Sequence, residues 1–153
     1  MSGAKRTLHY FVVPGRPQGK GSKRVLPIRS KRRQGGVVLV DSNRNAAPWE
    51  ARIGAAARAE FGERELIRGP VAVRVSFFFA RPKGHYRTGR NAGLLRDTAP
   101  RFMATLPDVD KLVRCALDAL SGIVIHDDTQ VIELHARKLY GEPEQAVFTI
   151  EEA

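Results

Sequence analysis

Hydrophobic residues recur along this chain with two different periods, and the two periods separate predicted strands from predicted helices. The alternation is clearest in residues 70–80, whose apolar positions on one face are Val71, Val73, Val75, Phe77 and Phe79. A period of two is typical of a β-strand. Phe78 and Ala80 make part of the opposite face apolar as well, so we expect this strand to lie in the centre of a sheet.

Shorter apolar runs bounded by turn residues predict the remaining strands. They cover residues 8–13, 37–40, 131–140 and 145–151, and a very short buried strand is expected at 123–125. We expect residues 37–40 to pair with residues 8–13 as a hairpin. The side chains predicted to face the core in the last two long strands are Ile132, Leu134 and Ala136, then Ala146, Phe148 and Ile150.

The first of two predicted helices covers residues 47–61, where apolar residues follow the spacing of an amphipathic helix. Pro48 falls in the first turn, where proline is tolerated, and Gly62 ends the helix. The spacing of Trp49 from Ile53 favours a core position for this tryptophan over stacking on a nucleobase.

The second helix is predicted at residues 108–121. Its apolar stripe consists of Leu112, Cys115, Ala116, Ala119 and Leu120, and Gly122 is its C-terminal stop. Together the elements predict one α+β domain over residues 1–153, with a mixed β-sheet and about two main helices packed on it.

Composition and charge narrow the class of protein. A length of 153 residues fits one domain with its own core. The chain carries 26 Lys and Arg against 16 Asp and Glu, a formal net charge of +10, which favours nucleic acid or another anionic surface as partner.

Cys115 is the single cysteine, so no internal disulfide can form. No run approaches the ~20 apolar residues of a membrane span. We expect a cytoplasmic protein with no membrane segment and no organic cofactor.

Two long loops hold much of the positive charge. Residues 14–36 carry eight cations and no acid, and residues 81–106 carry six cations and one acid, so together they hold 14 of the 26 cations. Clustered Lys and Arg release counterions from DNA, which makes both loops candidate DNA contacts; a solvated, mobile arm is the alternative for the first loop. The candidate DNA-binding residues in them are Arg16, Lys20, Lys23, Arg24, Lys83 and Arg87.

Four aspartates stand out against this positive background. Asp108 and Asp110 open the second helix, and Asp127 and Asp128 follow the short apolar run after it. Carboxylate oxygens are hard ligands that suit Mg²⁺ or Mn²⁺, so these four are the candidate metal ligands. The alternatives are that Asp108 caps the helix and that Asp127 and Asp128 form an ordinary turn. The spacing permits the two pairs to meet but does not prove it.

Other polar side chains accompany the acids. Lys111 is a candidate phosphate contact, and Asp118 is interpreted as structural. Arg114 follows Asp110 by four residues, so it either forms a weak surface ion pair or stabilises negative charge in a phosphoryl transition state. A guanidinium stays protonated and cannot act as a general base. His126 is either a ligand or proton shuttle, or a strand-end histidine without such a role.

The runs PDVDKL at 107–112, LDAL at 117–120 and DDTQV at 127–131 resemble the RusA family of Holliday junction resolvases, in particular its phage and prophage branch. The resemblance implies a homodimeric, Mg²⁺-dependent endonuclease that cuts branched DNA. It places the catalytic roles on Asp108, Asp110 and Asp128, with Asp127 as a supporting acid. Arg114 stands where the family usually has a lysine, so the charge is kept while a group able to transfer protons is lost.

Residues and resemblance together predict a metal-dependent, structure-specific endodeoxyribonuclease. It would resolve Holliday junctions by paired nicking during DNA recombination and repair, and leave 5′-phosphate and 3′-hydroxyl ends. Two alternatives stay open: a branched-DNA-binding protein without chemistry, and a nuclease with broader activity on branched or flap DNA. An RNA-binding module is less favoured, because the chain lacks the aromatic-rich strand pattern of the RRM kind.

Overall fold

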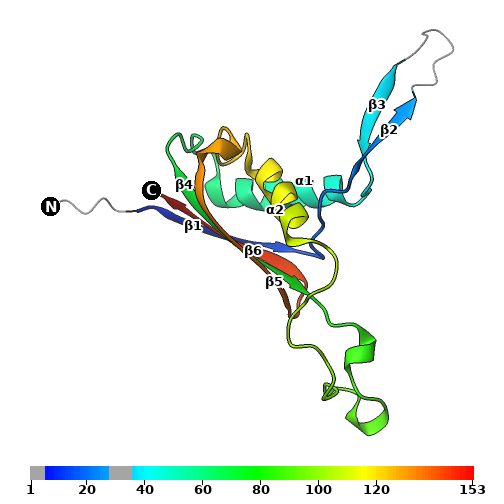
Figure 1. The fold of residues 1–153 in the computed structure, drawn as a ribbon. Helices are drawn as coiled ribbons and strands as arrows, with labels where there is room; N and C mark the ends of the chain where they lie inside the picture. The colour runs from blue at the N-terminus through cyan, green and yellow to red at the C-terminus, as the bar shows by residue number, and fades with distance from the viewer. Residues whose placement is uncertain (1–5, 28–35) are drawn as a thin grey trace.

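The structure, a computed structural model, describes residues 6–27 and 36–153. Its strands and helices are β1 (Leu8–Pro14), β2 (Lys23–Pro27), β3 (Val37–Asp41), α1 (Ala46–Phe61), β4 (Val71–Phe79), α2 (Val109–Leu120), β5 (Val131–Tyr140) and β6 (Gln145–Glu152), with short 3₁₀ turns η1 (Lys83–His85), η2 (Gly89–Asn91) and η3 (Asp128–Gln130). The predicted α+β fold is confirmed (Figure 1). Four predicted loop cations lie outside the described residues: Arg29, Lys31, Arg32 and Arg33.

β4 is the strand around which the main sheet is built. The strand order is β1-β6-β4-β5, so β4 has a neighbour on each side. It pairs parallel with β5 and antiparallel with β6, and β1 adds antiparallel to the far side of β6. The sheet is therefore mixed, and the central position expected of β4 is confirmed.

The core lies between this sheet and the two helices, which cover one of its faces (Figure 1). All five alternating residues of β4 are at most 2% exposed. Trp49 and Ile53 of α1 join the same buried cluster as Leu112 and Cys115 of α2. Each large apolar side chain buried in this way contributes about 1.5–3 kcal/mol, so the sequence periods determine which faces meet. The core position predicted for Trp49 is confirmed.

The predicted hairpin between residues 37–40 and 8–13 is wrong. β3 pairs antiparallel with β2 instead, and β2 lies inside the segment that was expected to be a loop. The two strands form a separate ribbon that projects from the body (Figure 1). β1 pairs with β6, and β3 pairs with the strand closest to it in sequence, for which the cost of closing the connection is small.

Two further strand predictions need correction. Residues 123–125 form a turn with isolated bridges rather than a strand, because the Leu120 carbonyl accepts the backbone N–H groups of Ile123 and Val124. In β5, Ile132 is 66% and Leu134 is 42% exposed, although both were expected to face the core. β5 is an edge strand, and residues 132–135 are exposed on both of its faces, so no described element covers this half of the strand.

The long basic segment at 81–106 is largely irregular and extends away from the sheet on another side from the ribbon (Figure 1). Its base is attached to the strands by Arg81, which lies 4.5 Å from the ring centre of Tyr140 in a cation–π contact. The inward positions predicted for β6 are confirmed, since Ala146, Phe148 and Ile150 are fully buried. Within the described part of the chain, no helix combines the length and the apolar character needed to cross a membrane.

Candidate metal and DNA site

Asp108 occupies the N-cap position of α2 with an extended backbone, φ −68° and ψ 139°. Its side chain makes no capping hydrogen bond; its recorded partner is the Lys111 ammonium, 3.4 Å from Oδ2. Asp110 lies in the first turn of the helix, and both aspartates are exposed. Their carboxylates therefore sit in the positive field of the helix N-terminus without being used as caps, and they can accept a cation or its bound waters.

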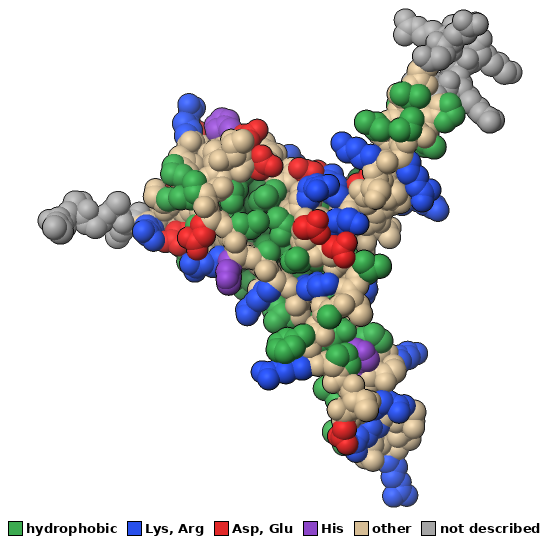
Figure 2. All heavy atoms as spheres, in the orientation of Figure 1, with side chains coloured by type: hydrophobic (Ala, Val, Ile, Leu, Met, Phe, Trp, Pro, Cys, Tyr) green, Lys and Arg blue, Asp and Glu red, His purple; other side chains and the backbone are tan. Residues whose placement is uncertain are grey.

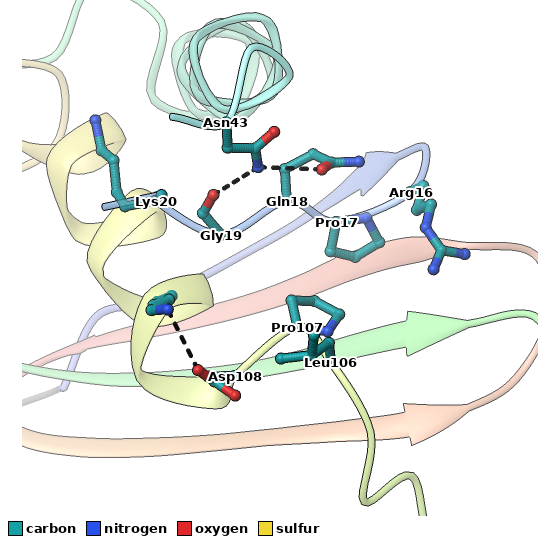
Figure 3. Close-up of a pocket in the computed structure, with 11 residues that line it drawn as sticks. Arg16, Pro17, Gln18, Gly19, Lys20, Asn43, Leu106, Pro107 and Asp108 are labelled. Carbon is teal, nitrogen blue, oxygen red and sulfur yellow. Dashed lines mark hydrogen bonds and ion pairs between the residues drawn. The ribbon is translucent and has the colours of Figure 1, made fainter. Parts of the chain in front are cut away.

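An open pocket of about 330 Å³ lies beside Asp108 (Figure 3). One wall is the segment Arg16–Gly21, and the other is Leu106–Asp108 together with Lys111; Asn43 completes the lining. The first of the two basic loops, residues 14–36, is called the first basic segment below. The pocket brings the start of this segment next to the acidic start of α2, although about 90 residues separate them in the sequence. This proximity is a tertiary contact between residues that are far apart in the sequence.

Hydrogen bonds hold the first wall in place. The backbone N–H of Lys20 donates to the Lys111 carbonyl (3.1 Å), and the Asn43 amide donates to the Gly19 carbonyl (2.8 Å). A β-carbon on Gly19 would lie 3.0 Å from the Lys111 β-carbon, so the close approach to α2 favours glycine here.

The side chain of Lys20 is held by acids from both helices. Its ammonium lies 2.7 Å from Glu50 Oε2 of α1 and 3.3 Å from Asp118 Oδ2 of α2. The Glu50 carboxylate, chiefly through its hydrogen bond, raises the pKa of Lys20 above the ordinary lysine value. Asp118, which was interpreted as structural, is therefore part of an ion-pair network.

The second wall is held by a residue that the sequence analysis did not select. Lys138 of β5 donates from its ammonium to the carbonyls of Thr105 and Pro107. Both carbonyls lie within three residues before Asp108, so the cation fixes the chain where it enters α2. A lysine near the end of an edge strand gives no sequence signal for this role, because its partners are backbone atoms about 30 residues away.

Asp127 and Asp128 lie at the opposite end of β5. Asp127 caps η3 by accepting the Thr129 backbone N–H at 2.8 Å, while the Gln130 side chain accepts the backbone N–H of Asp127 (3.1 Å). The Thr129 hydrogen bond lowers the pKa of Asp127 below its ordinary value. The turn alternative thus describes Asp127 well, and Asp128 is exposed beside it.

The length of β5 separates the two aspartate pairs within one chain. Lys138, which bonds the carbonyl before Asp108, lies seven residues beyond Val131, or about 23 Å along a strand. Asp128 precedes Val131, so it lies near the other end of the strand. In residues 6–27 and 36–153, no three His, Cys, Asp or Glu side chains come together as a ligand group. Asp108 and Asp110 therefore both lie at the start of α2, whereas Asp128 lies near the far end of β5.

The remaining candidate cations differ in how they are engaged. Arg16 lies 2.8 Å from Glu144, and Arg87 lies 3.1 Å from Asp97. The exposed candidates for which the described residues provide no ion pair are Lys23, Arg24, Lys83 and Arg114. In particular, the ion pair considered between Arg114 and Asp110 does not form there, so the Arg114 guanidinium faces solvent on α2.

Two further side chains near the site have separate outcomes. Cys115 is fully buried in the core, as its place in the apolar stripe predicts, and burial raises the pKa of its thiol to about 12. His126 is exposed, and its backbone N–H donates to the Gln130 side chain at 2.8 Å. This contact involves only the main chain, so the ligand and strand-end interpretations of the imidazole both stay open.

Comparison with known proteins identifies the family. The model of the family described as endodeoxyribonuclease RusA matches residues 14–151, which is nearly the whole chain, so the chain belongs to this family. The resemblance drawn from the aspartate motifs is confirmed. A Bacillus subtilis (strain 168) protein, named "Uncharacterized protein YqaN", is 34% identical over 92 residues. That match covers 57% of this chain and 61% of the relative, less than two thirds of its length.

Proposed function

We propose that this protein is a metal-dependent endodeoxyribonuclease that resolves Holliday junctions by paired nicks. The observation that carries the proposal is the pair of exposed carboxylates of Asp108 and Asp110, which are not used as helix caps and lie beside an open pocket. The chain that carries them belongs to this nuclease family. A polyanionic substrate would approach the chain through its +10 net charge. Phosphate contacts would supply affinity and position, and junction shape would supply selectivity.

The donor set fits Mg²⁺, or Mn²⁺, better than any other common metal. Asp108 and Asp110 offer hard carboxylate oxygens, and Mg²⁺ usually takes only one or two protein carboxylates while keeping several waters. When bound, the ion would supply Lewis-acid polarisation of a phosphodiester and a more acidic water. Lys111, now paired with Asp108, would be released toward a phosphate. The Arg114 guanidinium would stabilise charge on the pentacoordinate phosphorus.

Asp128 would complete this site from a second copy of the chain. Within one chain it lies near the far end of β5 from Asp108, so the predicted ligand set of Asp108, Asp110 and Asp128 needs either a large rearrangement or a partner. In a two-fold dimer, any contact between a surface of the first copy and a surface of the second copy occurs twice, with the two copies exchanged. It would therefore build two equal sites, each with Asp108 and Asp110 from one copy and Asp128 from the other. Two such sites suit the two strands cut in a four-way junction.

Mixed dimers test both the chemistry and this arrangement. Asp108→Asn and Asp128→Asn should each abolish nicking of a synthetic four-way junction with Mg²⁺, while junction binding is kept or improved because negative charge is removed. Mixing the two inactive variants in equal amounts should restore about a quarter of wild-type activity, because half of the dimers are mixed and each holds one intact site. The restored nicks should be unpaired.

Other outcomes of that experiment favour other conclusions. If the mixture stays inactive while native mass spectrometry, with one variant ¹⁵N-labelled, shows exchanged dimers, Asp128 does not act across a dimer. Wild-type activity of Asp108→Asn would remove Asp108 from the site. A panel of linear, flap, three-way and four-way DNA, with Mg²⁺ and with EDTA, separates the two alternatives. Binding without Mg²⁺-dependent nicks indicates a non-catalytic protein, and equal cutting of flaps indicates a broader nuclease.

A further inference from the structure

Among the described cations of the first basic segment, Lys20 differs from Arg16, Lys23 and Arg24 in what its side chain contacts. Its ammonium lies between two carboxylates, Glu50 of α1 and Asp118 of α2, at 2.7 and 3.3 Å. The side chain is only 24% exposed, against 53% for Arg16, and Lys23 and Arg24 on β2 are exposed. A cation already neutralised by two acids has little charge left to release counterions from DNA.

The backbone on either side of Lys20 is held as closely as its side chain. Gly19 lies against Lys111 of α2, and its carbonyl accepts the Asn43 amide. The Gly21 N–H donates to Asp41 Oδ1 at 2.8 Å. The segment therefore touches the end of β3, the start of α2 and, through Lys20, the second turn of α1 and the last turn of α2. Figure 3 shows Lys20 directed away from the pocket, whose wall is formed by Gln18, Gly19 and the neighbouring backbone.

We propose that Lys20 is a positioning residue that fixes the pocket wall beside Asp108, rather than a phosphate contact. The Glu50–Lys20–Asp118 bridge joins α1, α2 and the basic segment, so the distance between the segment and Asp108 depends on it. The proposal rests on the proposed nuclease function. It predicts that the two acids matter as much as the lysine, although they have the opposite charge to a DNA-binding group.

This opposite charge gives a decisive test. The double variant Glu50→Gln, Asp118→Asn raises the net charge by two and leaves Lys20 unpaired. If Lys20 bound phosphate, this variant would bind the junction more tightly and nick it at least as fast. As a positioning residue, Lys20 needs both acids, so the single-turnover nicking rate at saturating junction should fall by about ten- to a hundredfold, as expected for a displaced reacting group. The single-turnover nicking rate of Lys20→Met should fall by the same factor, and Lys20→Arg should recover part of the rate.

Two comparators make the result specific. Glu60→Gln with Glu63→Gln raises the net charge equally at exposed positions near the end of α1, and its single-turnover rate should match the wild type. Lys23→Met represents a phosphate contact, and the slope of log affinity against log salt should decrease by about one. Lys20→Met should leave that slope unchanged. Wild-type nicking by the Glu50→Gln, Asp118→Asn variant, or a reduced slope in Lys20→Met, would overturn the proposal.

Hydrogen exchange separates this proposal from the nuclease function itself. The Lys20 backbone N–H donates to the Lys111 carbonyl, so its exchange reports on the wall without any DNA. Both Lys20→Met and the double acid variant should accelerate exchange of this amide by at least tenfold, while amides of β4 keep wild-type rates and so show that the fold is intact. If wild-type protein does not nick, the nuclease function fails, and this exchange result alone decides the positioning role. Unchanged exchange at Lys20 would contradict it.

Discussion

Gly21 lies where the basic segment crosses the turn that follows β3, and Gly21→Ala perturbs that crossing directly. A β-carbon on Gly21 would lie 2.3 Å from Ser42 Oγ, 2.6 Å from the Asn43 backbone nitrogen and 2.6 Å from Asp41 Oδ1. Two of these neighbours belong to a hydrogen-bonded unit, because Asp41 Oδ1 accepts the N–H groups of both Gly21 and Asn43 at 2.8 Å. The segment must therefore move away from Asp41.

The magnitude follows from the contact that is lost. A hydrogen bond to a charged group contributes about 1.5–3 kcal/mol, and alanine offsets about 0.4–1 kcal/mol by restricting the unfolded chain. The net loss in the free energy of unfolding is then about 0.5–2.6 kcal/mol. At this chain length, each 1 kcal/mol changes Tm by about 2–4 °C, so Tm should fall by about 1–10 °C.

Thermal unfolding followed by circular dichroism measures this loss, and Gly69→Ala is the matched control. A β-carbon on Gly69 meets no heavy atom within 4 Å, so its Tm should stay within about 1 °C of the wild type or rise slightly. Junction nicking by Gly21→Ala should also fall, since the pocket wall moves with the segment. If the Tm of Gly21→Ala equals that of Gly69→Ala, the tight packing of the segment on the β3 turn is wrong.

Two predictions concern titratable groups. Because burial raises the pKa of Cys115 to about 12, its thiol should resist iodoacetamide at pH 8 in the native protein and react fully in urea; mass spectrometry checks this, and rapid native labelling would contradict the burial. The hydrogen bond from Thr129 lowers the pKa of Asp127 in the folded protein. The cap therefore stabilises the fold at pH values above the ordinary carboxyl pKa of about 4. This stabilisation is lost as the pH falls through the lower pKa of the folded state. Urea midpoints of Asp127→Asn should therefore lie below the wild type at pH 7 and approach it below pH 4, whereas a constant difference would count against the cap.

The elements predicted correctly from the sequence are those in which one face is buried along the whole length of the element. All five inward residues of β4 are buried, so its alternation is complete, and the stripe of α2 matches the buried cluster residue by residue. β5 fails this condition, because its first half lies at the edge and is open on both faces. Ile132 and Leu134 are apolar without being buried, and alternation cannot distinguish the two cases. β2 was missed because two cations and one proline make up three of its five residues.

The candidate site divides in the same way into local and long-range parts. Asp108 and Asp110 are two residues apart at a helix start, so their proximity follows from local geometry. Whether Asp128 reaches them depends on the path of β5, which no spacing rule gives. Lys20 and Lys138 were beyond sequence reasoning for a related reason: their partners lie 30 or more residues away. A lysine in a cationic loop resembles a DNA contact until its acids are located.

The net charge of +10 overstates what is available to DNA, and the placement of the unpaired charge indicates how DNA would approach. Among the candidate DNA contacts, the cations already paired with acids are Arg16, Lys20, Arg87 and Lys111. The others in the two basic segments lie on the two projections seen in Figure 2, Lys23 and Arg24 on the ribbon and Lys83 on the 81–106 segment. The pocket lies at the base of both projections. One wall, residues 16–21, immediately precedes β2, and the other begins at residue 106, where the 81–106 segment ends. Under the proposed function, DNA held by both projections would therefore present its phosphates to the opening beside Asp108.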